Sequence, residues 1–274
     1  MTRPTLVEDL VAGAADQRAR LTTIVGTVRV WNDREVATGA WRRWIASRPP
    51  GSVARLASHG PIRPWSGWTA WLANRIRRWP RGTSGRVSSA TPFDVAPPRM
   101  VSSIWMARPN RWRAETRAEG GAETGVMVLD GDRGGFAVIG RDRQGVERVE
   151  PNAESPLGLH AIVMGMIDAE QILGRLSLVS TGSATHQGRE CYRLVGSLRD
   201  TDDFPVWPAD SYEVLLDRRR GILLKYTALL DSAPYAGAEF SEVAFDVELP
   251  ADTFSVTESP DRHRWPARIL MSVS

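Results

Sequence analysis

The sequence predicts a mainly β fold built on a large, curved antiparallel sheet. Between Arg99 and Val256, short β-type segments follow one another at roughly ten-residue intervals. Turn formers such as Pro109-Asn110, Asp130-Gly131-Asp132 and Arg220-Gly221 separate them. Parallel strands would need crossovers of about a dozen residues or more, so this spacing indicates antiparallel pairing. The predicted strands are RMVSSIWMA, RWRAETRA, TGVMVLD, GGFAVIGR, RECYRLVGSLR, SYEVLLD, ILLKYTALL and AEFSEVAFDVEL.

Helices are expected before the strand run. The first covers residues 5–20, with Thr5 as N-cap and Glu8 three residues on, as in a capping box. A strand, LTTIVGTVRVW, follows it. The next segment, NDREVATGAWRRWIA, predicts a second helix capped by Asn32 or Asp33.

The most unusual segment is WSGWTAWLANRIRRW, which lies between Pro64 and Pro80. In a helix, Trp65, Trp68, Leu72, Ile76 and Trp79 share an arc of about 80°. Trp71 and Arg75 flank this arc, and Asn74, Arg77 and Arg78 lie on the other side. Such a basic amphipathic helix is typical of a membrane interface. A helix whose Trp face packs on the sheet would give the same pattern. The residues expected at a membrane are Trp65, Trp68, Leu72, Arg75, Ile76, Arg77, Arg78 and Trp79.

A second helical segment interrupts the strand run at residues 155–174, SPLGLHAIVMGMIDAEQILG. Its apolar cluster predicts a cover over one face of the sheet, with Asp168 capping a short helix that ends near Leu173. Methionine is adaptable, so Met164 and Met166 suit an apolar pocket and also an ordinary gap in a core.

Length and composition indicate a globular protein with a sizeable core. The chain has 274 residues, 42% of them hydrophobic and 24% charged. The single cysteine, Cys191, excludes an intramolecular disulfide. No stretch reaches the ~18 apolar residues of a membrane span. The N-terminal residues lack the apolar region of a signal peptide, so a cytoplasmic protein, peripheral to a membrane, is expected.

Charge is distributed unevenly along the chain. Residues 1–120 carry 20 arginines against 8 acidic residues, a net charge of +12, whereas residues 121–274 carry 15 basic against 24 acidic residues, a net charge of −9. Either the molecule has a basic pole and an acidic body, or the two oppositely charged halves pack on one another. Nucleic acid is an unlikely partner, because the Trp face of residues 65–79 is separated from most of the arginines.

No arrangement of residues points to catalysis. The histidines share no metal-ligand spacing, and neither a GxSxG turn nor a phosphate-binding glycine loop is present. Cys191 lies inside a predicted strand, where cysteine is usually an inert apolar residue. The acidic group at residues 200–203 lacks the glycine and distal glutamate of a calcium loop. We therefore expect a protein that is not an enzyme and needs neither cofactor nor metal.

The strand run resembles the lipoprotein-carrier superfamily of LolA, LppX/LprG and RseB-like proteins, in particular its actinobacterial sorting-protein relatives. The segment Pro109 to Glu115 is similar to the family's "P-x-x-x-R-x-E" strand, and Asp130-Gly131 to its "DG" turn. Gly188 to Tyr192, DRRRGILL at residues 217–224, and the ending from Phe240 to Phe254 are similar to later hairpin landmarks. The landmarks keep the family order over about 160 residues.

This resemblance implies a single domain: an open half-barrel sheet with an N-terminal helix and first strand (1–40), a lid (155–174) within the strand run (99–256), and a tail (257–274). Residues 41–98, basic and Trp-rich, have no counterpart in the family pattern. The resemblance also implies non-catalytic binding of a lipid, lipoprotein or other apolar ligand in the concavity of the sheet. A regulatory module that binds a protein partner, as in the RseB-like branch, is the alternative, and an uncharacterised enzyme the third possibility. The expected ligand-binding residues are Trp112, Met127, Leu129, Phe136, Met164, Met166, Tyr192, Leu215 and Tyr226.

Overall fold

The computed structural model describes most of the predicted strand run and the N-terminal elements. It describes residues 5–47, 99–108, 111–119, 123–130, 135–141, 147–151, 159–199 and 207–254. The Trp-rich segment at residues 65–79 and the tail at 257–274 lie outside the described residues.

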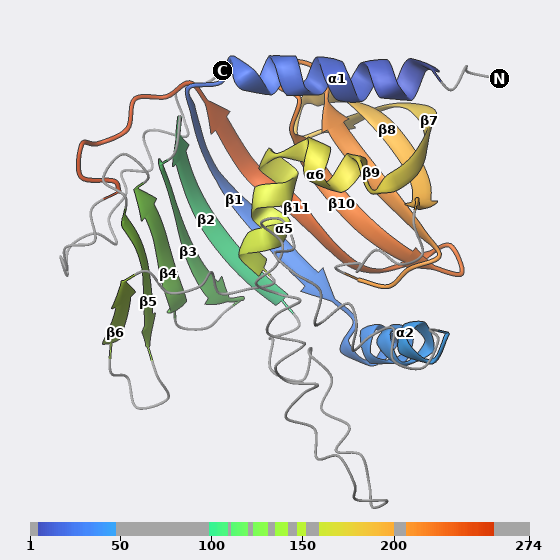
Figure 1. Ribbon diagram of the computed structural model, residues 1–274, viewed down its shortest axis with the longest axis horizontal. Coiled ribbons are helices and arrows are strands. Elements are labelled where there is room, and N and C mark those ends of the chain that lie inside the picture. Colours follow the sequence, from blue (N-terminus) through green and yellow to red (C-terminus); the bar gives the residue numbers. More distant parts are fainter. Residues whose placement is uncertain are drawn as a thin grey trace, which may run out of the picture. The chain divides into compact units, whose positions relative to one another are not determined.

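Of the described strands, all but β1 come after residue 98, in two runs separated by two short helices (Figure 1). The helices are α1 (Thr5–Ala19), α2 (Arg34–Ala46), α5 (Leu159–Ile167) and α6 (Ala169–Leu173). The strands are β1 (Thr23–Asn32), β2 (Arg99–Ala107), β3 (Arg111–Ala118), β4 (Glu123–Asp130), β5 (Gly135–Arg141), β6 (Glu147–Pro151), β7 (Leu176–His186), β8 (Arg189–Leu198), β9 (Ser211–Asp217), β10 (Leu223–Leu230) and β11 (Ala233–Phe245).

The described strands form one open sheet in the order β6-β5-β4-β3-β2-β1-β11-β10-β9-β8-β7. Every pairing with a defined register is antiparallel. The predicted mainly β class, with an open antiparallel sheet and a few helices, is confirmed. None of the described helices is long and apolar enough to cross a membrane.

The chain divides into two compact units, and each is described by itself. Unit 1 contains Met1–Ala19, Arg29–Met100 and Glu154–Glu239; unit 2 contains Arg20–Val28, Val101–Ala153 and Phe240–Ser274. Strands β1 and β11 contribute residues to both units. Whether the chain folds as a single domain therefore stays a prediction.

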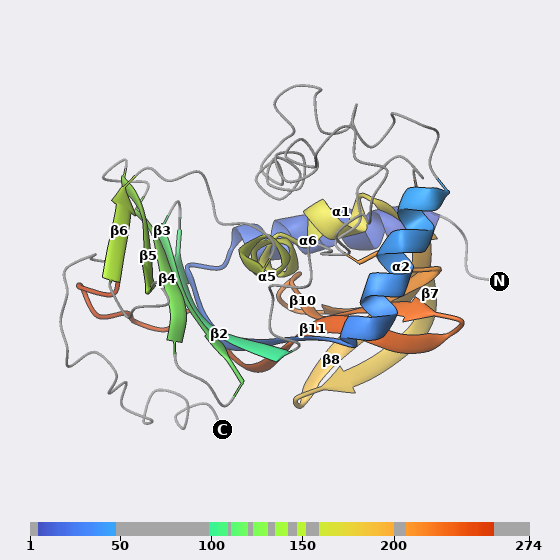
Figure 2. The ribbon, with the colours of Figure 1, turned by 90° about the horizontal axis from the view of Figure 1, so that it is seen from below.

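Unit 1 has a sheet with one apolar face, which we call the inner face. The register aligns its residues in two rows across β8 to β11. The side chains between them, on the outer face, include Arg193, Glu213, Lys225 and Glu239, and none of these is buried. Helix α5 packs on β10, and α6 packs against α1 and β7 (Figure 2). The inner-face residues, all buried, are Leu194, Val214, Tyr226 and Ala238 in one row and Tyr212, Ala228 and Ala236 in the other.

In unit 2 the chain beyond β11 covers part of the sheet. Trp105 of β2 and Phe254 are buried against each other, with Val25, Ala107 and Leu249 packed around them. The Arg111 guanidinium lies 4.5 Å from the centre of the Phe254 ring. The Nη1 of Arg113 donates a hydrogen bond of 3.3 Å to the carbonyl oxygen of Thr253. These contacts fix the end of the described chain.

Several boundaries differ from the predicted ones for local reasons. Strand β11 ends at Phe245 because Asp246 has a left-handed backbone (φ 56°), where its Oδ1 accepts a 2.9 Å hydrogen bond from the amide of Thr22. Strands β6 and β7 were not predicted, since one carries three charges and a proline and the other is rich in Ser and Thr. Asp33 caps α2 as predicted, accepting bonds from the amides of Glu35 and Val36.

The predicted lid is two helices rather than one short helix. Asp168 stands at the N-cap of α6, as predicted, but its side chain makes no capping hydrogen bond. Its carboxylate instead forms an ion pair with Arg18 of α1 and accepts a 2.7 Å hydrogen bond from the Nε2 of Gln171. Asp168 therefore occupies the predicted cap position, while its carboxylate bonds to Arg18 and Gln171 and not to the helix amides.

Two glycines with left-handed backbones allow a test of the contact between α1 and the β9–β10 turn. A Cβ on Gly221 (φ 66°) would lie 2.0 Å from the carbonyl oxygen of Ala14, whereas a Cβ on Gly188 (φ 74°) would meet no atom within 4 Å. Gly188→Ala should lower the unfolding free energy by about 1–2 kcal/mol, the cost of the backbone alone. Gly221→Ala should cost about 1–3 kcal/mol more, because the added methyl clashes with α1. Equal losses in urea denaturation would contradict this contact.

Candidate functional site

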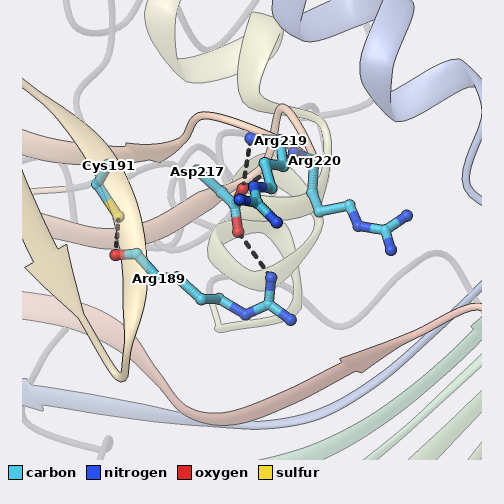
Figure 3. A network of polar contacts seen from close by, with 5 residues as sticks. All are labelled: Arg189, Cys191, Asp217, Arg219 and Arg220. Carbon is cyan, nitrogen blue, oxygen red and sulfur yellow. Dashed lines mark hydrogen bonds and ion pairs between the residues drawn. The ribbon is translucent and has the colours of Figure 1, made fainter. Parts of the chain in front are cut away.

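A cluster of polar groups surrounds Asp217, at the end of β9 (Figure 3). Its carboxylate is only 2% exposed. Oδ1 accepts hydrogen bonds from the backbone amides of Arg219 (2.8 Å) and Arg220 (2.9 Å), and Oδ2 accepts one of 3.2 Å from the Nη1 of Arg189. Its own carbonyl oxygen accepts from the amide of Gly221. The carboxylate therefore holds the β9–β10 turn closed.

Cys191 faces Asp217 across the β8–β9 pairing and is also buried. Its Sγ donates to the carbonyl oxygen of Arg189 at 3.5 Å. Burial, and then the negative charge of Asp217, raise the pKa of the thiol to about 11. Because the thiolate is the reactive form, a thiol that stays protonated at neutral pH is a poor nucleophile. The Asp217 cluster therefore has the properties of a structural element.

Within the described residues, no group of three or more His, Cys, Asp or Glu side chains could hold a metal ion. The feature of unit 1 that can serve binding is the inner face together with α5 and α6, which we call the lid. All members of the inner face are buried, and the lid contributes buried Ile162, Val163, Met166 and Ile167 from α5.

An aromatic stack forms part of the inner face. The Tyr226 ring stacks on Tyr212 and on Trp207, with ring centres 5.5 Å and 5.8 Å apart. The Tyr212 hydroxyl donates to the carbonyl oxygen of Trp207 (2.8 Å), and the Tyr235 hydroxyl to that of Pro208 (2.5 Å). Burial raises the pKa of all three tyrosines well above the usual value. The hydroxyls therefore remain neutral.

The lid is attached to the N-terminal helix by charge. Arg18 of α1 pairs with Asp168, which lies between α5 and α6, and both side chains are only partly exposed. The amide of Asp168 donates a 2.6 Å hydrogen bond to the carbonyl oxygen of Met164, closing the last turn of α5. The chain of α5 itself, LHAIVMGMI, contains no acidic or basic residue apart from its histidine. The ion pair between Arg18 and Asp168 therefore connects the lid to α1.

The structure brings together only some of the predicted ligand-binding residues. Tyr226 lies on the inner face, Met166 is fully buried in α5, and Met164 is half-buried on the same helix. Tyr192 is half-buried, and the Arg218 guanidinium lies over the Tyr192 ring, 4.5 Å from the ring centre. Leu215 stands one residue from the inner-face row, on the opposite side of β9 from Val214.

The other predicted residues lie in unit 2. Trp112 is buried on β3, and the register places Leu129 opposite it and Phe136 opposite Leu129. Met127 stands opposite Ala114, one step along the same face of the sheet. The predicted membrane-contact residues 65–79 lie outside the described residues. Sequence reasoning missed Trp207, Tyr212 and Tyr235, although the alternation in SYEVLLD places Tyr212 on the same face as Val214.

Comparison with known proteins yields similarities of fold. No family model matches the chain, and no curated protein matches it. MucB in the MucA/MucB complex of Pseudomonas aeruginosa has 14% identity and a TM-score of 0.47, covering 92% of this chain and 61% of that one. The Mycobacterium tuberculosis lipoprotein LppX has 10% identity and a TM-score of 0.44, covering 92% and 100%. A LolA superfamily protein from Nitrosomonas europaea has 8% identity and a TM-score of 0.32, covering 91% and 97%.

These neighbours, MucB, the lipoprotein LppX and a LolA superfamily protein, belong to the groups named in the predicted resemblance, and the likeness is one of fold. The chain spans about three fifths of the length of MucB. At these identities and TM-scores the likeness does not assign a ligand.

Two substitutions of Asp217 should separate the effect of its turn hydrogen bonds on stability from the effect of its charge. Asp217→Ala leaves two turn amides and Arg189 without their acceptor, so the unfolding free energy should fall by about 2–4 kcal/mol. Asp217→Asn keeps an oxygen for the turn amides and loses only the charge, so it should cost less than half as much. Urea denaturation of both variants measures this. Equal losses would mean that the turn hydrogen bonds do not matter.

The Cys191 thiol should react slowly in the folded protein. With Ellman's reagent at pH 8, we expect the native rate to be at least 100-fold below the rate in urea, because burial and Asp217 keep the thiol protonated. The unfolded chain loses this proton first as the pH rises from about 9 to about 11, so the thiol's contribution to the unfolding free energy falls over that range. Fast reaction in the native state would contradict the buried, neutral thiol.

Proposed function

We propose that the protein is a non-catalytic binding protein for a lipid or another apolar ligand, which binds to the inner face of unit 1 in the place of α5. The observation that carries the proposal is the composition of α5. This nine-residue helix presents apolar side chains on every side and has only one titratable residue, His160. An ordinary helix at a protein surface has a polar face, and one without it must be enclosed.

The burial of α5 agrees with its composition. Val163 and Met166 are completely buried, and Ile162 and Ile167 nearly so. At 100° per residue these four positions span well over a third of the helix circumference. Their contribution to stability comes from removing apolar surface from water, at roughly 25 cal/mol per Å². This contribution does not depend on direction or on specific partners.

An apolar ligand could therefore replace α5 on the inner face if the helix buries its own apolar side chains elsewhere, as against a membrane surface. An acyl chain laid on Tyr226, Ala228 and Ala238 would cover the apolar surface that the helix now covers. No ionised group would be stripped of water on this face, because the tyrosine hydroxyls are neutral. The polar cost of opening lies mainly in the Arg18–Asp168 ion pair. A membrane surface, contacted by the segment at residues 65–79, is the proposed source of the ligand.

The proposal predicts that the full-length protein binds cis-parinaric acid, a fluorescent fatty acid, with saturation near one equivalent. Arg18→Ala should speed its uptake at least threefold in stopped-flow measurements, because the tie that holds the lid to α1 is lost. Arg20→Ala, at an exposed residue just beyond the same helix, should leave the rate unchanged.

Two results would contradict the proposal. The first is no saturable fluorescence increase together with a ligand-free mass in native mass spectrometry after incubation with mixed lipids. The second is uptake that is equally fast in the wild type, Arg18→Ala and Arg20→Ala, which would mean that α5 and α6 do not control access. Circular dichroism of both variants serves as the control for folding.

A further inference from the structure

The terminal strand of unit 1, β7, has the features of a docking edge. It is the last strand in the sheet order, beside β8, and its other edge pairs with no strand that the structure describes (Figure 1). With eleven residues, Leu176–His186, it is longer than most of the other strands. Every second residue of an edge strand directs its amide and carbonyl groups away from the sheet, where they can pair with another chain.

The surface of β7 is accessible. Ser177, Thr181, Ser183 and Thr185 are exposed, and Val179 has 62% of its surface exposed, more than any other large apolar residue of the described chain. Although α1 and α6 pack against β7, no segment that the structure describes covers these five side chains.

Proteins usually protect such an edge with charges, proline or a bulge. From Leu176 to Thr185, β7 contains no charged residue and no proline. A single irregularity in the pairing with β8 occurs between Ser180 and Gly182, where Gly182 has φ 131°. Apart from this bulge, the strand from Leu176 to Thr185 carries neither the charges nor the proline that usually protect an edge.

The charge around this edge differs in sign from that of the surrounding sequence. Residues 175–199, which form the β7–β8 hairpin, carry four arginines and one glutamate, a net charge of +3, within a region (residues 121–274) of net charge −9. From the β9–β10 turn, Arg218 reaches across the Tyr192 ring and donates a hydrogen bond to the Oγ of Ser183 on β7. A further positive charge therefore lies at the middle of the strand.

We propose that β7 binds an extended, acidic segment of a partner protein, which adds to the sheet as a further strand. The backbone groups of the edge would supply affinity without sequence preference, as in other cases of β-strand addition. Two hairpin arginines are already paired, Arg189 with Asp217 and Arg193 with Glu213. Arg218 and the remaining net positive charge of the hairpin would select an acidic strand and steer its approach. This site is separate from the inner face, so the proposal does not rest on lipid binding.

The test uses the full-length protein and a fluorescein-labelled peptide of eight residues that alternates glutamate with valine. Fluorescence polarisation should show saturable binding that weakens with added salt. Two control peptides should bind at least tenfold more weakly: one with lysine in place of glutamate, and one with N-methyl groups on every second residue, which removes the hydrogen-bond donors of one edge.

A pair of variants locates the site. Val179→Glu places a negative charge beside the added strand and should weaken peptide binding at least tenfold, because like charges on neighbouring strands repel. Val36→Glu makes the same change at the other exposed large apolar residue, on α2, and should not alter binding. Since both side chains are exposed, neither change should unfold the protein.

Hydrogen exchange provides an independent measurement. Bound peptide should slow exchange at alternate amides between Ser177 and Thr185. No saturable binding, equal binding of the N-methylated peptide, or equal effects of Val179→Glu and Val36→Glu would each overturn the proposal. Tighter binding of the lysine peptide would overturn the acidic character of the partner.

Discussion

The apolar inner face of unit 1 is the constraint on which the rest of that unit depends. A sheet with one apolar face must bury it against another layer. Here the aromatic stack around Tyr226 and the small residues Ala228, Ala236 and Ala238 give the face its shape. The short alanine side chains leave room for a helix to pack close to the sheet, while the tyrosine rings fill the space beside them. The identity of these side chains thus determines how closely α5 can lie on β10.

The polar groups of unit 1 are placed where they do not disturb this layer. Asp217 and Cys191 lie at the end of the β8–β9 pairing, and the Arg18–Asp168 pair lies beyond the end of α5. The Tyr212 and Tyr235 hydroxyls each donate to a backbone carbonyl oxygen, as the low dielectric of an interior requires. The outer face carries the opposite composition, with Arg193 bonded to Glu213 across neighbouring strands. The two faces therefore differ in what they can bind.

Local sequence patterns were enough to predict most of the strands. They were not enough to predict which residues from distant segments come together. Segments with clear alternation or strong β formers, such as RWRAETRA and SYEVLLD, are strands with the predicted bounds. Strand β7 was missed because an exposed edge needs no apolar alternation, so the signal that identifies a half-buried strand is absent from it. Successive residues of a strand face opposite sides, and the pairing register shows that Val214, and not Leu215, lies in the inner-face row. The stack of Trp207 on Tyr226 joins residues of different segments, and no single segment encodes it.

The place of β1 in the sheet has a consequence for how the chain acquires its structure. This strand, near the N-terminus, lies between β2 and β11, and the Thr22–Asp246 hydrogen bond joins residues 224 positions apart. Contacts between such distant residues form slowly, because the intervening chain must first be brought into a closed loop. On the ribosome, β1 remains without its β11 neighbour until the long stretch of chain between the two strands has been synthesised. A nascent chain of this protein therefore depends on protection of its unpaired strands for most of its synthesis.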